Sequence, residues 1–355
     1  MFFNILYQTD YGMIEVYDFE SGKVEEFLKR RKVKRAAVQL PADFKSRLRE
    51  ITPVFERTGV EALILADSCY GACDLADKKA KQLGCDALIH YGHADMGLPV
   101  CLPTLFVEAR MTVDPTEAIE RVLPELKGRL GLATTVQHIG HLERTKEMLE
   151  RNAVEVVTGE PGPRVKYPGL VLGCDWGCVK SVAGDVDGFL YLGTGRFHPL
   201  GIALATGKSV VVVNPIAGGW EKLSPKLDDF IRRRKAMIAR ASVCEKFGVV
   251  TSIKPGQRRF KLMENLVHGL RSSGMSAESI VADEIVPEKL SEFQVEAFVC
   301  AACPWIPIDD AERFDRPVLS PFEAMVLLGK MDLEPYQLDE IGRSDVEVSA
   351  RVKSS

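Results

Sequence analysis

The chain has 355 residues, 46% of them hydrophobic, which is enough for two or three domains with sizeable cores. Its 46 basic and 50 acidic residues give a formal net charge of −4, so no nucleic-acid partner is expected. No run reaches the roughly 18 apolar residues of a membrane helix, and the N-terminus lacks the features of a signal peptide. We therefore expect a cytoplasmic protein without membrane contact, whose nine cysteines indicate metal or redox chemistry rather than disulfides.

The first part of the chain alternates predicted strands with predicted helices. Apolar runs bounded by turn residues predict strands at Arg35–Leu40, Ala62–Ala66, Asp86–Tyr91 and Val100–Glu108. Amphipathic stretches predict helices at Phe19–Arg31, Phe44–Gly59 and Leu75–Leu83, and Gly84 is placed to end the last of these.

The alternation continues to the end of the chain. A second group of strands is predicted at Leu130–Gln137, Gly169–Gly173, Gly188–Leu192 and Ser209–Val213, with helices at His141–Asn152 and Pro199–Thr206. A long basic helix, Pro225–Phe247, leads to a third group, with strands at Gly248–Ile253, Ser279–Glu284, Ala297–Ala301 and Pro317–Ser320 and helices at Phe260–Ser273, Val286–Phe293 and Pro321–Gly329. Residues 331–355 are polar, and we expect them to be loosely attached or disordered.

Cysteine loops mark an internal repeat. Cys73 and Cys174 each follow an apolar strand and are 101 residues apart, and in both copies the next strand begins 13 residues later, at Asp86 and Asp187. In a third copy Cys303 follows the strand Ala297–Ala301. One α/β unit used three times is the simplest explanation of this spacing.

We therefore predict an α/β fold of three repeated units, each a mostly parallel sheet flanked by helices, around a central cluster site. The predicted units are residues 1–110, 111–217 and 218–335, followed by a polar C-terminal tail at 336–355. Ligands of such sheets bind beyond the carboxyl ends of the strands, where all three cysteine loops lie.

Three thiolates from three loops suit an iron–sulfur cluster or a zinc ion. Cys69, Cys178 and Cys300 have no counterpart in the other units, so we expect accessory or structural roles for them. Cys85, Cys101 and Cys244 fit equally well as small buried apolar residues. The spacing alone leaves open a non-catalytic zinc-stabilised binding protein and a small-molecule iron–sulfur enzyme, such as a dehydratase or a quinolinate-synthase-like protein.

Four motifs resemble a known family. They are Asp67–Asp74 (DSCYGACD), Leu172–Cys174, Gly193–His198 (GTGRFH) and Ala302–Pro304. In this order they resemble the archaeal diphthamide synthase of the first step, a 2-(3-amino-3-carboxypropyl)histidine synthase of the non-standard radical S-adenosylmethionine type. The resemblance runs from about Phe19 to Gly329, and Trp305 stands where that family commonly has Arg after Cys-Pro.

The resemblance implies a [4Fe–4S] cluster held by Cys73, Cys174 and Cys303, in a homodimer. It implies S-adenosylmethionine as cosubstrate at the open iron, cleaved at the methionine γ-carbon to a 3-amino-3-carboxypropyl radical. That group is added to the imidazole C2 of a histidine in elongation factor 2, and an electron donor is the second expected partner. The protein supplies orientation and exclusion of water.

Further candidate residues lie in one glycine loop and at three strand ends. One group is the loop Gly193, Thr194, Gly195, Arg196 and His198, whose glycines allow close approach of a ligand and which precedes a helix N-terminus that favours a carboxylate. The resemblance implies that this loop contacts S-adenosylmethionine. Gln39, Gln137 and Gln257 lie at or after first strands, and Gln39 and Gln257 are predicted to bind the cofactor. An ordinary turn and solvated glutamines are the alternatives, and no side chain is assigned a catalytic role. The basic run Arg232–Lys235 is predicted to be a solvated helix face or a dock for an acidic partner.

Overall fold

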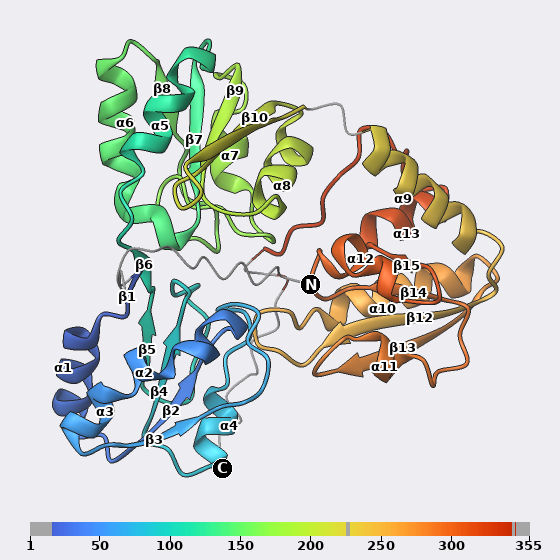
Figure 1. The fold of residues 1–355 in the computed structure, drawn as a ribbon. Helices are drawn as coiled ribbons and strands as arrows, with labels where there is room; N and C mark the ends of the chain where they lie inside the picture. Colours follow the sequence, from blue (N-terminus) through green and yellow to red (C-terminus); the bar gives the residue numbers. More distant parts are fainter. Residues whose placement is uncertain (1–15, 225–227, 343–344, 346–355) are drawn as a thin grey trace.

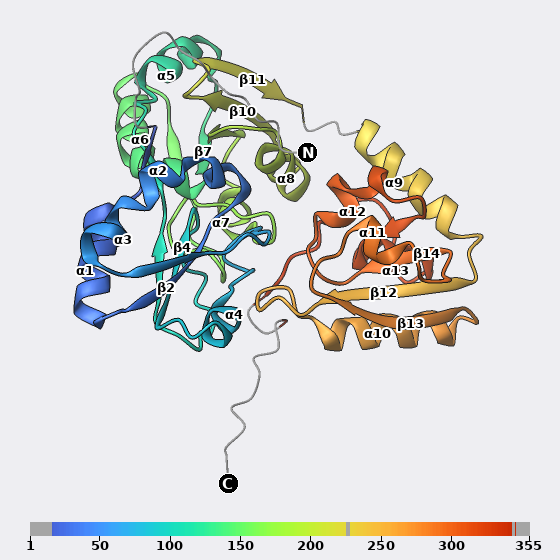
Figure 2. The ribbon, with the colours of Figure 1, turned by 60° about the horizontal axis from the view of Figure 1, so that its bottom comes forward.

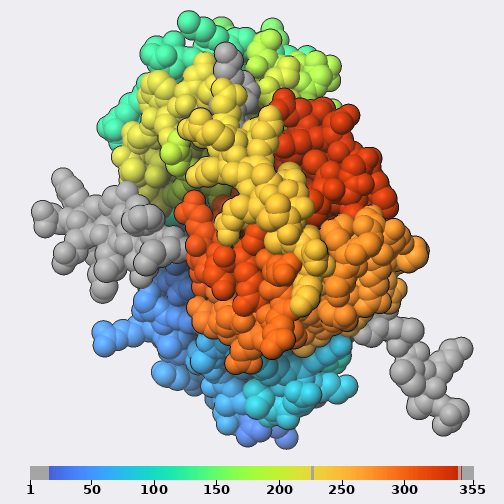
Figure 3. Space-filling model, turned by 90° about the vertical axis from the view of Figure 1, so that its right-hand side faces the viewer, coloured from blue at the N-terminus to red at the C-terminus, as the bar shows by residue number. Residues whose placement is uncertain are grey.

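The computed structural model describes residues 16–224, 228–342 and 345, and it contains the three α/β units that the sequence predicts. The units lie at the corners of a triangle, each with its own sheet (Figure 1). Figure 3 shows the third unit in front, with the first below it and the second above it. In the described part of the chain, no helix is both long and apolar enough to cross a membrane.

The first sheet is entirely parallel, in the order β3-β2-β4-β5. Its strands are β2 (Arg35–Gln39), β3 (Glu61–Ile64), β4 (Ala87–Tyr91) and β5 (Thr104–Val107). Helices α1 (Ser21–Arg31), α2 (Leu48–Ile51) and α3 (Pro53–Thr58) pack on one face and α4 (Asp77–Gln82) on the other, because alternate residues of each strand face opposite sides. A short ribbon of β1 (Tyr17–Asp18) and β6 (Arg110–Met111) lies beside this sheet.

The second sheet has the order β11-β10-β9-β7-β8, and only β11 is antiparallel. Its strands are β7 (Leu130–Thr134), β8 (Val156–Thr158), β9 (Gly188–Leu192), β10 (Ser209–Asn214) and β11 (Gly219–Leu223). Helices α5 (Thr116–Val122) and α6 (Leu142–Arg151) cover one face, and α7 (Gly177–Val182) and α8 (Phe197–Thr206) cover the other. Since β11 pairs with β10, this sheet extends past the predicted boundary at residue 217.

The third sheet is parallel, in the order β13-β12-β14-β15. Its strands are β12 (Lys246–Ser252), β13 (Ser276–Ala282), β14 (Ala297–Cys300) and β15 (Val318–Leu319). Helices α9 (Asp228–Ala241), α10 (Phe260–Ser272) and α13 (Pro321–Leu327) share one core cluster on this sheet. The shorter α11 (Pro287–Leu290) and α12 (Ile306–Asp309) contribute to a second cluster. Short 3-10 turns are η1 (Ala42–Arg47), η2 (Leu123–Glu125), η3 (Val136–His141) and η4 (Ala311–Arg313).

The repeat predicted from the cysteine loops is confirmed by topology and by a hydrogen bond that recurs in every unit. In each sheet the first strand of the unit lies between its second and its third. The acidic residue just before the third strand accepts backbone N–H groups at the start of the first strand. These pairs are Asp86 with Lys34 and Arg35, Asp187 with Arg129, and Glu296 with Glu245 and Lys246.

The prediction of a strand at Gly169–Gly173 is wrong. Its place in the sheet is taken by β8, and the segment forms only isolated bridges, Thr134 with Leu170 and Leu172 with Asp175. The loop after β8 is rich in Gly and Pro, which do not continue a strand. Close packing also requires glycine there, because a Cβ at Gly159 would lie 1.9 Å from the carbonyl oxygen of Cys178.

Other predicted boundaries shift for local reasons. The helix predicted at Phe44–Gly59 is divided into η1, α2 and α3, because Pro53 has no N–H to continue a helix and starts α3 instead. The helix predicted at Pro225–Phe247 ends at Ala241, and Phe247 already lies in β12; its first residues, 225–227, are outside the described part. The strand predicted at Val100–Glu108 is confined to β5.

The basic run Arg232–Lys235 is not wholly solvated, because Arg234 is buried against Glu323.

The chain after α13 is docked, so the prediction of a loosely attached tail is wrong for residues 331–342. Tyr336, Leu338 and Ile341 are 8%, 9% and 2% exposed. The backbone N–H of Ile341 donates to the carbonyl of Cys174 over 3.0 Å, and Glu340 accepts the N–H of Trp176. The apolar residues spaced along this segment therefore fix it to the second unit beside a cysteine loop. Residues 346–355 lie outside the described part.

Tyr336 anchors this segment to the third unit. Its hydroxyl donates to Glu323 over 2.9 Å, and its ring packs against Phe230 and Phe322. Glu323 also pairs with Arg234 and forms a capping box with Ser320 at the start of α13. One buried carboxylate thus joins α9, α13 and the C-terminal segment.

Removing this anchor should destabilise the protein. We expect Tyr336→Ala to lower the free energy of unfolding by about 3–5 kcal/mol, the usual cost of deleting a buried aromatic ring. Tyr336→Phe should cost about 1–3 kcal/mol, because only the hydrogen bond to a charged group is lost. Denaturant unfolding would measure both, with Met331→Ala, at a partly exposed position of the same segment, as control. A Tyr336→Ala variant as stable as that control would contradict the docking.

Candidate active site

Three cysteine loops from three units leave strands at their carboxyl ends. Cys73 lies between β3 and α4, Cys174 between β8 and α7, and Cys303 between β14 and α12. Figure 2 shows how the loop that leaves β12 reaches across to the first unit. The three units therefore meet at the end of their sheets where ligands of α/β proteins bind.

The three thiols are buried and influence one another electrostatically. Burial raises the pKa of Cys174 to about 12; the guanidinium of Arg164 opposes this rise, and the neighbouring Cys73 and Cys303 add to it. Burial likewise raises the pKa of Cys303 to about 12, again with a contribution from Cys73. Part of each residue nevertheless stays accessible. The three thiols, one from each unit, therefore interact with one another, and soft metals prefer thiolate ligands.

A close contact at Gly256 fixes the Cys73 loop against the third unit. The N–H of Gly256 donates to the carbonyl of Cys73 over 2.8 Å. A Cβ at Gly256 would lie 2.5 Å from both Cα and Cβ of Cys73, so no larger residue fits. The carbonyl of Gly256 accepts Nη2 of Arg164 over 2.8 Å, which adds the second unit to the same contact. In the loop Lys254–Gln257 the sequence analysis singles out only Gln257, and it gives no sign of the contacts at Gly256.

Lys254 makes a second link between the third unit and the Cys73 loop. Its ammonium lies 2.7 Å from the Asp74 carboxylate and 3.7 Å from that of Asp283. Both Lys254 and Asp74 are buried, so the pair holds the loop in one position once it is formed. Sequence reasoning missed this residue, because a lone lysine in a loop carries no pattern.

The three glutamines at first-strand ends all bridge loops. Gln257 donates from Nε2 to the sulfur of Cys73 over 3.3 Å. Gln137 donates to the carbonyl of Gly92 over 2.7 Å and so ties the second unit to the first. Of the three glutamines, Gln257 is therefore the one whose side-chain N–H would interact with the sulfur ligand of a group bound by Cys73.

Gln39 is buried, and the protein uses both ends of its amide. Nε2 donates to the carbonyl of Asp74 over 2.5 Å, and Oε1 accepts the N–H of Ala76 over 3.1 Å. Oε1 also faces Nδ1 of His90 at 2.9 Å. Gln39 thus shapes the turn after Cys73, and none of its side-chain hydrogen bonds among the described residues goes to a cysteine.

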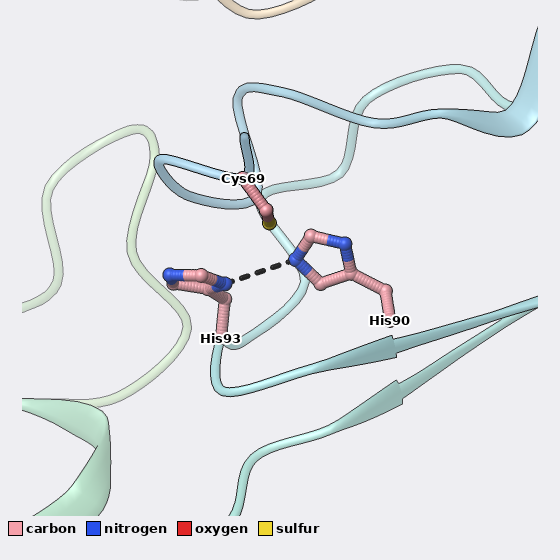
Figure 4. A group of neighbouring side chains, drawn as sticks. All are labelled: Cys69, His90 and His93. Atoms are coloured by element: carbon pink, nitrogen blue, oxygen red, sulfur yellow. Dashed lines mark hydrogen bonds between the residues drawn. The ribbon is translucent and has the colours of Figure 1, made fainter. Parts of the chain in front are cut away.

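His90, His93 and Cys69 form a group of potential metal ligands within the first unit, with ligand atoms within 4.8 Å of one another (Figure 4). Because Oε1 of Gln39 can only accept, Nδ1 of His90 carries the proton and Nε2 accepts from Nδ1 of His93 over 3.0 Å. Burial lowers the pKa of both rings, to about 4 for His93. Burial also raises the pKa of the Cys69 thiol to about 12. The hydrogen-bonded pair of His90 and His93 is linked through Gln39 to the turn after Cys73, so we interpret it as support for that turn.

The loop predicted to contact S-adenosylmethionine lies at the N-terminus of α8. Gly195 has a φ of 75°, which glycine adopts without strain, and Thr194, Gly195 and Arg196 are exposed. Arg196 forms an ion pair with Glu221 at 3.3 Å. His198 stacks on Tyr191, and burial lowers the pKa of its imidazole to about 4, so the ring is neutral at physiological pH. The middle of this loop is therefore exposed, whereas Gly193 is buried.

The accessory cysteines donate to the backbone. Cys178 donates to the carbonyl of Gly159 over 3.3 Å, and Cys300 donates to that of Cys303 over 3.7 Å; both are buried. Trp305 is also structural, because its indole N–H donates to Gly173 over 2.5 Å and its ring packs on Phe197. Trp305 thereby connects the Cys303 loop to the Cys174 loop. Cys101 is exposed rather than buried.

Comparisons with known proteins find relatives over most of the chain. The family model described as "Putative diphthamide synthesis protein" matches residues 40–337. A 2-(3-amino-3-carboxypropyl)histidine synthase of Pyrococcus horikoshii is 40% identical over 330 residues, covering 92% of this chain and 94% of that protein. Its namesake in Methanocaldococcus jannaschii is 31% identical over 300 residues, covering 81% and 79%. A crystal structure of Dph2 from Pyrococcus horikoshii with a 4Fe-4S cluster matches with a TM-score of 0.85 at 38% identity, covering 92% of this chain and 95% of that one.

The contact at Gly256 predicts that a methyl group added at this position destabilises the protein, whereas one added at an open position does not. Gly256→Ala must displace the Cys73 loop, so we expect a loss of about 1–3 kcal/mol of stability, as in other overpacked sites. We also expect faster alkylation of Cys73 in metal-free protein. Thermal unfolding and mass spectrometry of the alkylated cysteines would measure the two effects. Gly184→Ala is the control, since a Cβ at Gly184 meets nothing within 4 Å. Equal behaviour of the two variants would contradict the contact.

Proposed function

The chain belongs to the diphthamide synthesis protein family, and we propose on that premise that it is a 2-(3-amino-3-carboxypropyl)histidine synthase. It transfers the 3-amino-3-carboxypropyl group of S-adenosylmethionine to the imidazole C2 of a histidine in elongation factor 2. The observation that carries this proposal is the convergence of one cysteine from each of three units at the ends of their sheets.

Cys73, Cys174 and Cys303 are proposed to hold a [4Fe–4S] cluster, which leaves one iron without a protein ligand. The donor set fits such a cluster, because the three thiols interact electrostatically and the charge of a buried cation, Arg164, acts on two of them. When bound and reduced, the cluster supplies the electron that breaks the bond between the sulfonium and the methionine γ-carbon. The thiols, whose pKa is raised, must release their protons when they bind iron.

The remaining residues bind, orient and exclude water. Gln257 donates to the Cys73 sulfur and so tunes the charge on that ligand. The loop Gly193–His198 receives S-adenosylmethionine, with its carboxylate near the N-terminus of α8. The neutral imidazole of His198 then serves as a hydrogen-bonding group rather than as a base. Gln39 acts indirectly, by shaping the turn after Cys73.

The proposed partners follow from the reaction. The protein substrate is folded elongation factor 2, so we place the enzyme in the cytoplasm, and a separate electron donor must reduce the cluster. A homodimer is proposed from the family resemblance alone. The relatives' shared name, over most of both chains, favours this function over a quinolinate-synthase-like or dehydratase activity and over a zinc-stabilised scaffold.

The reaction predicts a particular fragment. With dithionite and S-adenosylmethionine, the protein should release 5′-methylthioadenosine, because the bond to the γ-carbon is the one that breaks. Liquid chromatography with mass spectrometry identifies this nucleoside. If 5′-deoxyadenosine is the main product instead, cleavage occurs at another carbon and the proposed transfer is wrong.

The ligand assignment predicts two classes of cysteine variant. Alanine at Cys73, Cys174 or Cys303 should each remove most of the cluster iron and all transfer, because alanine offers the iron no ligand atom. Alanine at Cys69, Cys178 or Cys300 should keep most of the iron, since those thiols are engaged in packing and hydrogen bonds. Iron and acid-labile sulfide, measured anaerobically for all six variants, separate the classes. A full cluster in Cys303→Ala would show that the third ligand is misassigned.

A further inference from the structure

Arg164 is a buried cation that lacks a paired anion. It is 3% exposed, and it takes part in none of the ion pairs formed among the described residues. The nearby carboxylate of Asp175 is directed elsewhere, because it accepts the backbone N–H groups of Arg164 and Gly177. An isolated buried charge is strongly unfavourable, so such a residue requires a negative partner that binds at this position.

One nitrogen of the guanidinium is also without a hydrogen-bond partner. Nη2 donates to the carbonyl of Gly256 over 2.8 Å, whereas the buried Nη1 has no partner within the described residues. Other buried arginines of the chain differ, since Arg234 is paired with Glu323 and Arg259 with Asp339. Arg259 also leaves one buried donor, Nε, without a partner, but its charge is neutralised by Asp339. Arg164 therefore differs from these two arginines in lacking, among the described residues, both a paired anion and a partner for Nη1.

The orientation of Arg164 points to the cysteine centre. A Cβ at Gly256 would lie 2.8 Å from Nη2 and 2.5 Å from atoms of Cys73, so the guanidinium lies beside the Cys73 backbone. Its positive charge acts on both Cys73 and Cys174 and favours their thiolate forms. The cation thus lies between ligands supplied by two units.

We propose that Arg164 is the buried counter-ion of the iron–sulfur cluster, with Nη1 donating a hydrogen bond to one of its sulfur atoms. This inference rests on the proposed function, because it requires the cluster held by Cys73, Cys174 and Cys303. An oxidised [4Fe–4S] cluster with three thiolate ligands carries one net negative charge, which would neutralise the positive charge of Arg164. Reduction by one electron from the external donor adds a second negative charge, so Arg164 stabilises the reduced form more than the oxidised one.

The test compares reduction potentials in the intact protein. Arg164→Gln removes the charge, and Arg164→Lys keeps the charge but not the planar fork of donors. Arg110→Gln is the control, because it also removes an arginine charge. The charge of Arg110 is already paired with Glu108, and its guanidinium also bonds to Tyr167. Each variant is reconstituted anaerobically, assayed for iron and sulfide, and titrated with dithionite while the reduced cluster is followed by electron paramagnetic resonance.

At the potential that half-reduces the wild-type cluster, Arg164→Gln should show a reduced-to-oxidised ratio about tenfold lower, as for the loss of one charge-assisted hydrogen bond. Arg164→Lys should shift less, and Arg110→Gln should not shift. Loss of the cluster from Arg164→Gln, with the unfolding transition of the apoprotein unchanged, also supports the proposal, because the fold survives without the counter-charge.

If the apoprotein of Arg164→Gln is itself destabilised, the potential of the Arg164→Lys cluster decides. An unchanged midpoint potential of a full cluster in Arg164→Gln, or in Arg164→Lys where Arg164→Gln holds no cluster, overturns the role of Arg164. Failure of the wild-type protein to take up a cluster would instead overturn the proposed function, so the two failures are distinguishable.

Discussion

The contact between Gly256, Cys73 and Arg164 is the constraint on which the rest of the site depends. Each residue comes from a different unit, and two hydrogen bonds of 2.8 Å join them through the carbonyls of Cys73 and Gly256. The backbones approach so closely that glycine alone fits at position 256. Three sheets are thereby held with their carboxyl ends together, and the contact fixes the Cys73 loop against the other two units.

Burial of these cysteines also means that thiolates formed there need cations nearby to compensate their negative charge. Burial raises the pKa of Cys174 and Cys303 to about 12, so without metal these thiols are protonated at neutral pH. Iron must therefore displace protons when it binds, and the resulting negative charge is compensated only where cations are available. Lys254 is already neutralised by Asp74, whereas Arg164 is not. The polar residues around the centre are thus of two kinds: those that hold loops in place, such as Gln39 and Lys254, and those directed at the thiols, such as Gln257 and Arg164.

Much of the fold could be predicted because strands of a buried parallel sheet are continuous apolar runs and because the unit recurs. The prediction of three similar sheets rested on the cysteine spacing and on clear strand and helix patterns. Examples are the strand at Ser209–Val213 and the helix at Phe260–Ser273, which the structure confirms. Gly169–Gly173 misled because its apolar residues pack beside β7 without joining the sheet, while the true strand, β8, has only three residues. The docked C-terminal segment was missed because its buried residues are spaced among polar ones. Arg164 and Gly256 could not be found from sequence, since their importance arises from contacts between units far apart in the chain.

The central claim is that one chain holds one [4Fe–4S] cluster through three cysteines and keeps one iron open. The most direct measurement is metal and sulfide analysis of anaerobically purified protein, together with its visible spectrum before and after dithionite. The account predicts a brown protein with about four iron and four sulfide ions per chain and a broad absorption that dithionite bleaches. A colourless protein with stoichiometric zinc and no sulfide would contradict it.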